Sequence, residues 1–434
     1  MRNRSLTTVF AIGAVTVALV ASGCSSPDDD TTETSSTASA FADVVVPEAF
    51  TSLTMTAIGD PTFPFLGTDQ RYHVAYDLQL TNASPVPATL DRVDVVDGTE
   101  PDNVIATFAG AALVDPTCSY GNCNRLQNVP NGVVDTAVIP PRTSRILFLD
   151  YTFDSLDDVP KAVLHHVYGT GANSPASREP APIDYVITPI DISASTPRVI
   201  SPPLRGDNWI ALNGCCEPGF PHRGSALPVD GKLNNSQRFA IDWKRTDDEG
   251  AFYVGDRTQN TSYVDYGSDI HAVADATVIS VLDDVAANAP GTLPAQDPVL
   301  AARLTALNVD GNHIVLDLGD GVYAMYAHLI EGSLLVKPGD RVTDGQVIAK
   351  LGNTGNANAS HLHFQLMNGP TLLGSDGLPY VFDEFDYAGQ VPVQAIMDAD
   401  DYLTGNFLQD KLPTAQKRTD ELPMNLAIVN FPES

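Results

Sequence analysis

Basic side chains are scarce in this sequence of 434 residues, in which 24 Lys and Arg face 54 Asp and Glu. The formal net charge is therefore −30. A surface this acidic repels the phosphates of nucleic acids and the headgroups of anionic lipids. We therefore expect no nucleic-acid partner and no binding to an anionic membrane surface.

Long apolar runs are missing as well. The run from about Val9 to Val20 is too short to span a bilayer. Arg2 and Arg4 precede it, and small residues lead from it to Cys24, as is typical of a lipoprotein signal peptide over residues 1–24. We expect Cys24 to be lipidated, so that the exported protein is anchored to the cell membrane and faces the wall or periplasm. Ordinary cleavage near Gly23 is the alternative, and it also exports the chain.

Cysteines are few, five in all. Cys118 and Cys123 bracket a four-residue loop, and outside the cytoplasm a small disulfide is the expected state. Cys215 and Cys216 are adjacent, so they pair either elsewhere or with each other. A zinc ribbon would need a second Cys-x-x-Cys pair, so disulfide chemistry is expected here.

Several catalytic motifs are absent from the sequence. It has no P-loop, no Gly-x-Ser-x-Gly and no His-Glu-x-x-His. The acidic turns at residues 247–250 and 317–321 lack the full spacing of a calcium loop, so we expect them to be solvated turns.

The composition favours two β-rich domains. Hydrophobic residues reach 43%, enough for packed cores, and 32 Gly with 32 Pro favour short strands and turns. Residues 25–43 are polar and acidic, which predicts a disordered Ser/Thr tether. A proline-rich linker at about 196–204 separates residues 44–196 from a second domain at 203–400, and 401–434 is expected to be a C-terminal tail that docks through Leu426–Val429.

Period-two alternation marks the first of these domains. Tyr72, Val74, Tyr76, Leu78 and Leu80 share one strand face, while His73, Asp77 and Gln79 share the other. The pattern predicts a half-buried antiparallel β-sandwich, and residues 81–95 resemble an immunoglobulin-like fold. We expect a spacer, or a docking module for an envelope protein partner. His73, His165 and His166 are expected to be structural, since the last two are neighbours on opposite faces of a strand.

The strongest chemical signal is the segment from Ser360 to Leu366. In a strand, His361, His363 and Gln365 lie on one face and the apolar Leu362, Phe364 and Leu366 on the other. Two imidazoles on one polar face are suitably placed for a metal together with a general acid or base.

Further blocks precede this pair in a fixed order. They are Tyr-Ala-His-Leu at 326–329, Gly-Asp-x-Val at 339–342, Gly-Gln-Val-Ile at 345–348 and Gly-Asn-Thr-Gly at 352–355. Together with His-Leu-His-Phe at 361–364 and an entry strand from His271, they resemble the core of the M23 metallopeptidases, the lysostaphin-like peptidases. The resemblance runs over about residues 267–366. His271 and His313 fall where that family uses no catalytic residue and are expected to be structural.

The resemblance implies a small antiparallel sheet that forms a groove with zinc at its base. In this family two His and one Asp hold the metal, with water in the fourth position. The positions that match are His363 and Asp242 for ligands, and His361 and His328 for the residues that act on the water and the developing oxyanion. The implied activity is zinc-dependent endopeptidase hydrolysis of peptide bonds in peptidoglycan stems or cross-bridges.

One position departs from the family pattern. The first two ligands come from His-x-x-x-Asp, but here Arg238 precedes Asp242, and an arginine has no lone pair for zinc. Either His222 supplies the missing nitrogen, or Arg238 pairs with Asp242. The second arrangement would leave a metal-free, catalytically inactive module that binds cell wall or activates a wall hydrolase. We favour the first, because some M23-like proteins resemble this chain in an upstream His-Arg segment followed by Arg-Phe-Ala-Ile-Asp, and because the other site residues are retained.

Overall fold

The computed structural model describes residues 48–59, 62–115, 124–130, 132–399, 403, 407 and 409–433. All of them belong to one compact unit, residues 39–434. The expected signal peptide with Cys24, the tether and the Cys118 and Cys123 pair lie outside the described residues.

Strands dominate this part of the chain, which confirms the expected mostly β fold class. Its helices are short: α1 (Pro298–Ala301), α2 (Val393–Met397) and the 3₁₀ turns η1 (Gly110–Ala112), η2 (Leu156–Asp158), η3 (Asn260–Ser262) and η4 (Pro294–Gln296). Across the described residues, no helix has the length and apolar character needed to cross a membrane.

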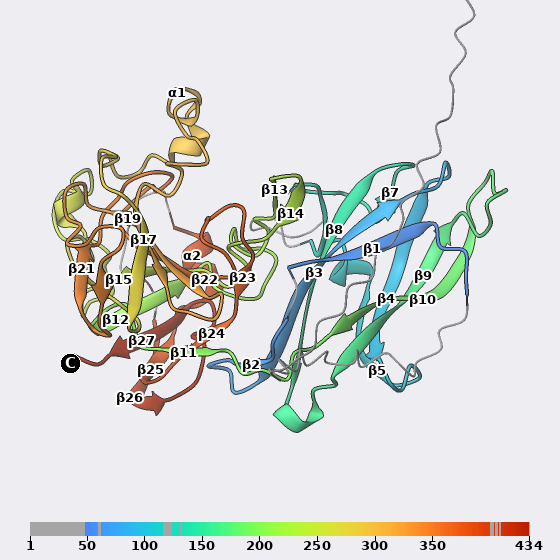
Figure 1. Ribbon diagram of the computed structural model, residues 1–434, viewed down its shortest axis with the longest axis horizontal. Coiled ribbons are helices and arrows are strands. Elements are labelled where there is room, and N and C mark those ends of the chain that lie inside the picture. The colour runs from blue at the N-terminus through green and yellow to red at the C-terminus, as the bar shows by residue number, and fades with distance from the viewer. Residues whose placement is uncertain are drawn as a thin grey trace, which may run out of the picture. The chain divides into compact units, whose positions relative to one another are not determined.

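Within the described residues, the N-terminal part forms two five-stranded antiparallel sheets (Figure 1). One contains, in spatial order, β1 (Leu53–Ile58), β3 (Tyr72–Asn82), β8 (Ser144–Phe153) and β6 (Leu126–Asn128), with β2 (Phe65–Leu66) also on β3. The other contains β10 (Ala181–Asp191), β9 (Ala162–Gly171), β4 (Ala88–Asp97) and β5 (Val104–Ala109), with β7 (Val138–Ile139) also on β4.

Both sheets contribute side chains to one hydrophobic core. Val74, Tyr76 and Leu78 of β3 meet Val93 of β4 and Val167 of β9 in this cluster. The alternation along β3 thus corresponds to a buried face, as expected. The immunoglobulin-like sandwich itself stays a prediction.

The second face of β3 differs from the half-buried sheet that the alternation predicts. His73 and Asp77 are both buried, although both were expected on a polar face. The reason is tertiary: Phe239, from the second half of the chain, packs edge-on against Phe65 of β2, and Phe65 stacks on His73. The first sheet is therefore covered on both sides at this point.

The C-terminal part is built on an eleven-stranded antiparallel sheet in the described residues (Figure 1). Its order is β20 (Arg341–Val342), β17 (Ala276–Leu282), β18 (Asn312–Asp317), β19 (Tyr323–Leu329), β22 (Leu362–Met367), β15 (Ile241–Arg245), β12 (Gly206–Leu212), β27 (Ala427–Phe431), β25 (Phe385–Gln390) and β26 (Asp410–Arg418), with β23 (Gly377–Leu378) beside β22. Three small sheets add β11 (Arg198–Ile200) with β24 (Tyr380–Phe382), β13 (Leu227–Val229) with β14 (Lys232–Asn234), and β16 (Asp269–His271) with β21 (Val347–Lys350).

Two segments have more structure than the sequence suggested. The expected linker contains β11, which pairs in parallel with β24. The expected C-terminal tail contributes β26 and β27, and β27 lies between β12 and β25 inside the sheet rather than docking on its surface. Apolar residues explain the second difference, because Ile428 and Val429 are fully buried in two separate hydrophobic clusters on opposite faces of the sheet.

His165 provides a test of the N-terminal core. It is fully buried, its Nδ1–H donates to the Thr188 carbonyl (2.8 Å), and its Nε2 accepts from the Tyr76 hydroxyl (2.8 Å). Burial lowers the pKa of His165 from 6.5 to about 4. The unfolded chain therefore takes up this proton at a higher pH than the folded chain, and stability is lost as the pH falls from 6.5 toward 4.

We expect wild-type protein to lose about 2 kcal/mol more unfolding free energy than His165→Gln between pH 7.5 and pH 5. Glutamine can also donate and accept at this position, but it does not titrate. Urea unfolding at both pH values measures the difference. Parallel pH profiles for the two proteins would show that His165 does not titrate on unfolding in this range.

Candidate metal centre

Three neighbouring strands bring the expected site residues together. Asp242 of β15 lies directly opposite His363 of β22 in the antiparallel register, and His363 lies opposite Ala327 of β19 on its other side. His361 comes just before β22, and His328 is the penultimate residue of β19. Side chains of directly opposed residues share a face, so the register alone places Asp242 beside His363.

His222 completes a cluster with Asp242 and His363. The potential ligand atoms of these three buried residues all lie within 4.8 Å of one another. His222 Nε2 is 3.3 Å from Asp242 Oδ2, and His363 Nδ1 is 2.9 Å from Asp242 Oδ1. Two imidazoles and one carboxylate are the protein ligands of one class of catalytic zinc site. The residues present therefore fit the metal that the sequence resemblance implies.

The remaining ring nitrogens have partners that orient the imidazoles. His222 Nδ1 is 3.0 Å from the Ala240 carbonyl, which can only accept, so this nitrogen carries the proton and leaves Nε2 available as a ligand. His363 Nε2 is 3.0 Å from Gln365 Oε1, which would accept its proton when Nδ1 binds a metal. Hydrogen bonds of this kind fix the tautomer and ring orientation of metal-bound histidines.

His328 and His361 flank this cluster. Their ring centroids are 4.6 Å apart, and His361 Nε2 is 3.5 Å from Asp242 Oδ1. Each ring donates its Nδ1–H to a backbone carbonyl, that of Thr354 for His328 (2.7 Å) and that of Ala359 for His361 (2.9 Å). The Nε2 atoms therefore carry lone pairs. The φ of His328 is 64°, so its backbone adopts the left-handed conformation near the end of β19.

Electrostatics divides the cluster into charged and neutral members. Burial lowers the pKa of His361 to about 4 and that of His328 well below its usual range, so both rings are neutral near pH 7. Burial would raise the pKa of Asp242, but its attraction to His222 and His361 in their protonated forms, with hydrogen bonds from His222 and His363, holds this pKa well below its ordinary value. The result is a buried carboxylate anion beside two neutral bases.

The structure adds residues that the sequence did not point to. Asn213 donates its side-chain N–H to Asp242 Oδ2 (2.7 Å) from 29 residues away. Burial raises the pKa of Asp310 to about 7, against the effect of nearby His363. Lys244 is buried, donates to the Ser360 carbonyl just before His361 and forms an ion pair with Asp265 (3.7 Å). Of these, only Lys244 has a sequence signal, since it lies two positions after Asp242 on the same strand face.

One of the two alternatives required Arg238 to pair with Asp242, and it does not. Its Nε donates instead to Asp77 Oδ2 in β3 (2.8 Å), and its Nη2 donates to the Ile58 carbonyl (2.6 Å). A turn in which Ala240 N–H bonds the Gln237 carbonyl separates Arg238 from β15. The proximity in sequence that suggested the pairing with Asp242 is therefore misleading.

The other singled-out residues lie outside the cluster. His271 and His313 bond the carbonyls of Gly345 and Gly311, which agrees with structural roles. Cys215 and Cys216 are bonded to each other in a buried disulfide, one of the alternatives left open by the sequence.

Comparisons with known proteins identify a segment of this chain that matches a protein family. Residues 263–373 match the model of peptidase family M23. This range contains His328, His361 and His363, whereas His222 and Asp242 lie before it.

Two curated proteins match short segments of the chain. The peptidoglycan DD-endopeptidase ShyA of Vibrio cholerae is 40% identical over 57 residues, and the glycyl-glycine endopeptidase ALE-1 of Staphylococcus capitis is 50% identical over 58 residues. Each alignment covers 13% of this chain, and they span only 13% and 16% of the two relatives. Among solved structures, the catalytic domain of the antimicrobial peptidase lysostaphin from Staphylococcus simulans is 21% identical, covers 35% of this chain and 80% of that one, and has a TM-score of 0.20.

We expect the full chain to bind zinc and His222→Ala to lose it. Loss of a group that hydrogen-bonds a metal ligand weakens metal binding about 10–100-fold. Removing one of the three ligands themselves should weaken zinc binding by more than this. Elemental analysis after dialysis against a weak chelator measures bound zinc per chain. His271→Ala, which removes a histidine outside the cluster, should keep the metal. Zinc retained by His222→Ala would remove His222 from the ligand set.

Proposed function

We propose that this chain, which carries a domain of peptidase family M23 at residues 263–373, is a zinc endopeptidase that hydrolyses peptide bonds in peptidoglycan stems or cross-bridges. The observation that carries the proposal is the cluster of His222, Asp242 and His363, with two further imidazoles beside it. The named activities of two relatives, a peptidoglycan DD-endopeptidase and a glycyl-glycine endopeptidase, support the substrate class.

Each residue of the cluster has a role in this proposal. His222 Nε2, His363 Nδ1 and an oxygen of Asp242 would hold the metal. Zinc, when bound, supplies Lewis-acid chemistry that acidifies water and polarises a carbonyl. His361 presents a neutral Nε2 that accepts the proton of the attacking water, because its Nδ1–H is already committed to the Ala359 carbonyl.

His328 has the second role at the reacting carbonyl. Its ring lies 4.6 Å from that of His361, and it is fixed by its bond to the Thr354 carbonyl. When the proton that His361 accepts from water passes to His328 Nε2, this N–H can donate to the oxyanion that develops on the substrate, and the proton finally goes to the leaving amine. Asn213 holds Asp242 in place through its hydrogen bond to Oδ2, so that the carboxylate would be oriented when it binds the metal.

The same proposal includes export and anchoring. A protein that cuts peptidoglycan must reach the wall, and the apolar N-terminal run followed by Cys24 supplies a lipoprotein signal for that purpose. The lipid on Cys24 would tether the chain to the membrane, and the N-terminal sheets would act as a spacer or contact an envelope protein.

The activity is tested by digesting purified peptidoglycan with the zinc-loaded full chain and identifying released peptides by mass spectrometry. We expect new amino termini that reveal the bond cut. His361→Ala should lower the rate by about 10²–10⁴-fold, because it removes the general base, while bound zinc is retained. His313→Ala serves as the matched control and should cleave as wild type does.

Two results would contradict the proposal. One is a zinc-loaded chain that leaves peptidoglycan of every cross-link type intact. The other is binding to the wall that persists in both His361→Ala and His363→Ala with no cleavage by wild type, which would indicate a non-catalytic wall-binding or hydrolase-activating module.

A further inference from the structure

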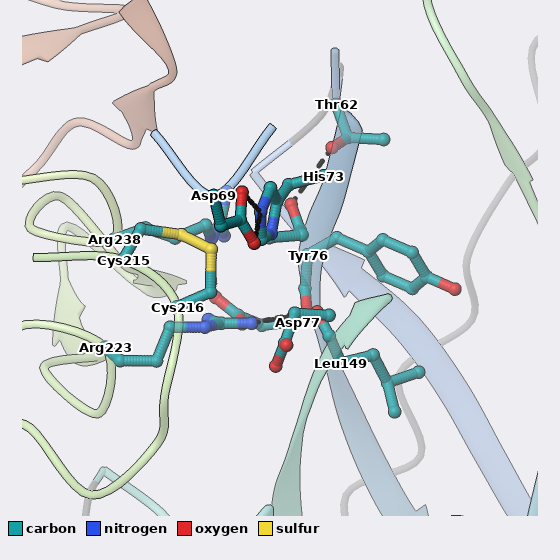
Figure 2. Close-up of a disulfide and its surroundings, with 12 residues drawn as sticks. Thr62, Asp69, His73, Tyr76, Asp77, Leu149, Cys215, Cys216, Arg223 and Arg238 are labelled. Atoms are coloured by element: carbon teal, nitrogen blue, oxygen red, sulfur yellow. Dashed lines mark hydrogen bonds and ion pairs between the residues drawn. A yellow bond between two sulfur atoms is a disulfide. The ribbon is translucent and has the colours of Figure 1, made fainter. Parts of the chain in front are cut away.

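A single buried carboxylate joins the N-terminal sheets to the segments that carry the metal cluster. Asp77 of β3 is fully buried, and it accepts hydrogen bonds from Arg223, from Arg238 Nε (2.8 Å) and from Asn235 Nδ2 (2.8 Å). Figure 2 shows the Arg223 side chain extending toward Asp77. Burial would raise the pKa of Asp77, but the charges of the two arginines hold it below its ordinary value. Asp77 is therefore an anion between two cations.

Arg223 fixes the segment of His222, since it follows His222 directly in the chain. Besides Asp77, its guanidinium donates to the carbonyls of Tyr76 (3.1 Å) and Leu149 (3.0 Å), both in the first N-terminal sheet. Asn235 closes this arrangement, because the same amide group that donates to Asp77 also donates to the Arg223 carbonyl (3.1 Å). Hydrogen bonds thus hold both the side chain and the backbone carbonyl of Arg223, the residue after His222.

Arg238 fixes the second segment, four residues before Asp242. It donates to Asp77 and to the Ile58 carbonyl, and Ile58 is the neighbour of Asp77 in the β1–β3 register. Between Arg238 and Asp242 lies Ala240, whose carbonyl accepts the Nδ1–H of His222. Asp77 therefore binds an arginine from each of the two segments that this hydrogen bond joins, the one after His222 and the one before Asp242.

From this geometry we infer that Asp77 is a positioning residue for the metal site, which fixes the loop of His222 and the start of β15 relative to each other. The inference rests on the proposed function and extends it: the N-terminal sheets help to form the zinc site, and they are more than a spacer. It also means that the C-terminal part without β3 would lack the carboxylate that Arg223 and Arg238 both bind.

The test compares zinc affinity between the full-length wild type and Asp77→Asn, by competition with a chromogenic chelator. Asparagine keeps the shape of the side chain but removes the charge that holds the arginines. We expect zinc affinity to fall about 10–100-fold, the usual effect of losing a group that orients a metal ligand. Cobalt in place of zinc should also show altered visible absorption bands, since these report the ligand geometry.

Asp94→Asn is the matched control. Asp94 is also a fully buried carboxylate of the N-terminal sheets, paired with Arg92 and bonded by Thr107 (2.7 Å), but both of these partners lie within those sheets. If Asp77 acts only by keeping the protein folded, both variants should lower thermal stability and leave zinc affinity and cobalt spectrum unchanged. A positioning role requires the change in Asp77→Asn alone.

Arg238→Met covers the case in which Asp77→Asn does not fold. It frees one segment while Arg223 still neutralises Asp77, so no buried charge is left unpaired. We expect weaker zinc binding in this variant also, and wild-type affinity in it would overturn the inference.

The results separate this inference from the proposed function. Wild type that binds no zinc would overturn both. Wild type that binds zinc, with folded Asp77→Asn of equal affinity and unchanged cobalt spectrum, would overturn the positioning role alone.

Discussion

The antiparallel register between β15 and β22 is the constraint on which the site depends. It sets Asp242 opposite His363, while the flanking pairs Ile241 with Phe364 and Trp243 with Leu362 point to the other face. Those four side chains are fully buried in one hydrophobic cluster. A slip of one residue would turn His363 into that cluster and bring an apolar side chain to the site. The packing of the apolar face thus fixes the chemistry of the polar one.

The buried basic residues of this chain lie next to segments that carry the site residues. Among the residues that the structure describes, the buried ones are Arg223, Arg238 and Lys244. Arg223 follows His222, and Lys244 bonds the carbonyl before His361. Removing one partner of a buried ion pair costs about 3–5 kcal/mol, so each such pair strongly favours one backbone arrangement. Here those arrangements are the ones that hold the imidazoles.

The sequence predicts those parts of the fold and the site that depend on nearby residues, and it does not predict those that depend on how distant strands pair. The strand of His361 and His363 follows from period-two alternation, and ordered motif blocks pointed to His328 and Asp242. The role of Asn213 could not be predicted from the sequence, because its hydrogen bond to Asp242 depends on how β12 pairs with β15. The place of β27 inside the sheet was also missed, because a short apolar stretch such as Leu426–Val429 does not reveal which strands it will pair with. Asp77 was assigned only to a polar face, and nothing near it in sequence indicates that arginines 146 and 161 residues away would cover it.

Arg238 shows why one departure from a family pattern is not by itself a sign of inactivity. An arginine four residues before Asp242 suggested an ion pair that would displace a metal, yet the turn before β15 directs it to Asp77. The same carboxylate anchors Arg223, and therefore the loop that brings His222 to within 3.3 Å of Asp242. The replacement at position 238 and the histidine at position 222 are thus two parts of one arrangement. A histidine at 238 that used one ring nitrogen for a metal would have a single donor left, so it could not link this segment to the N-terminal sheet through two donors at once, as the guanidinium does.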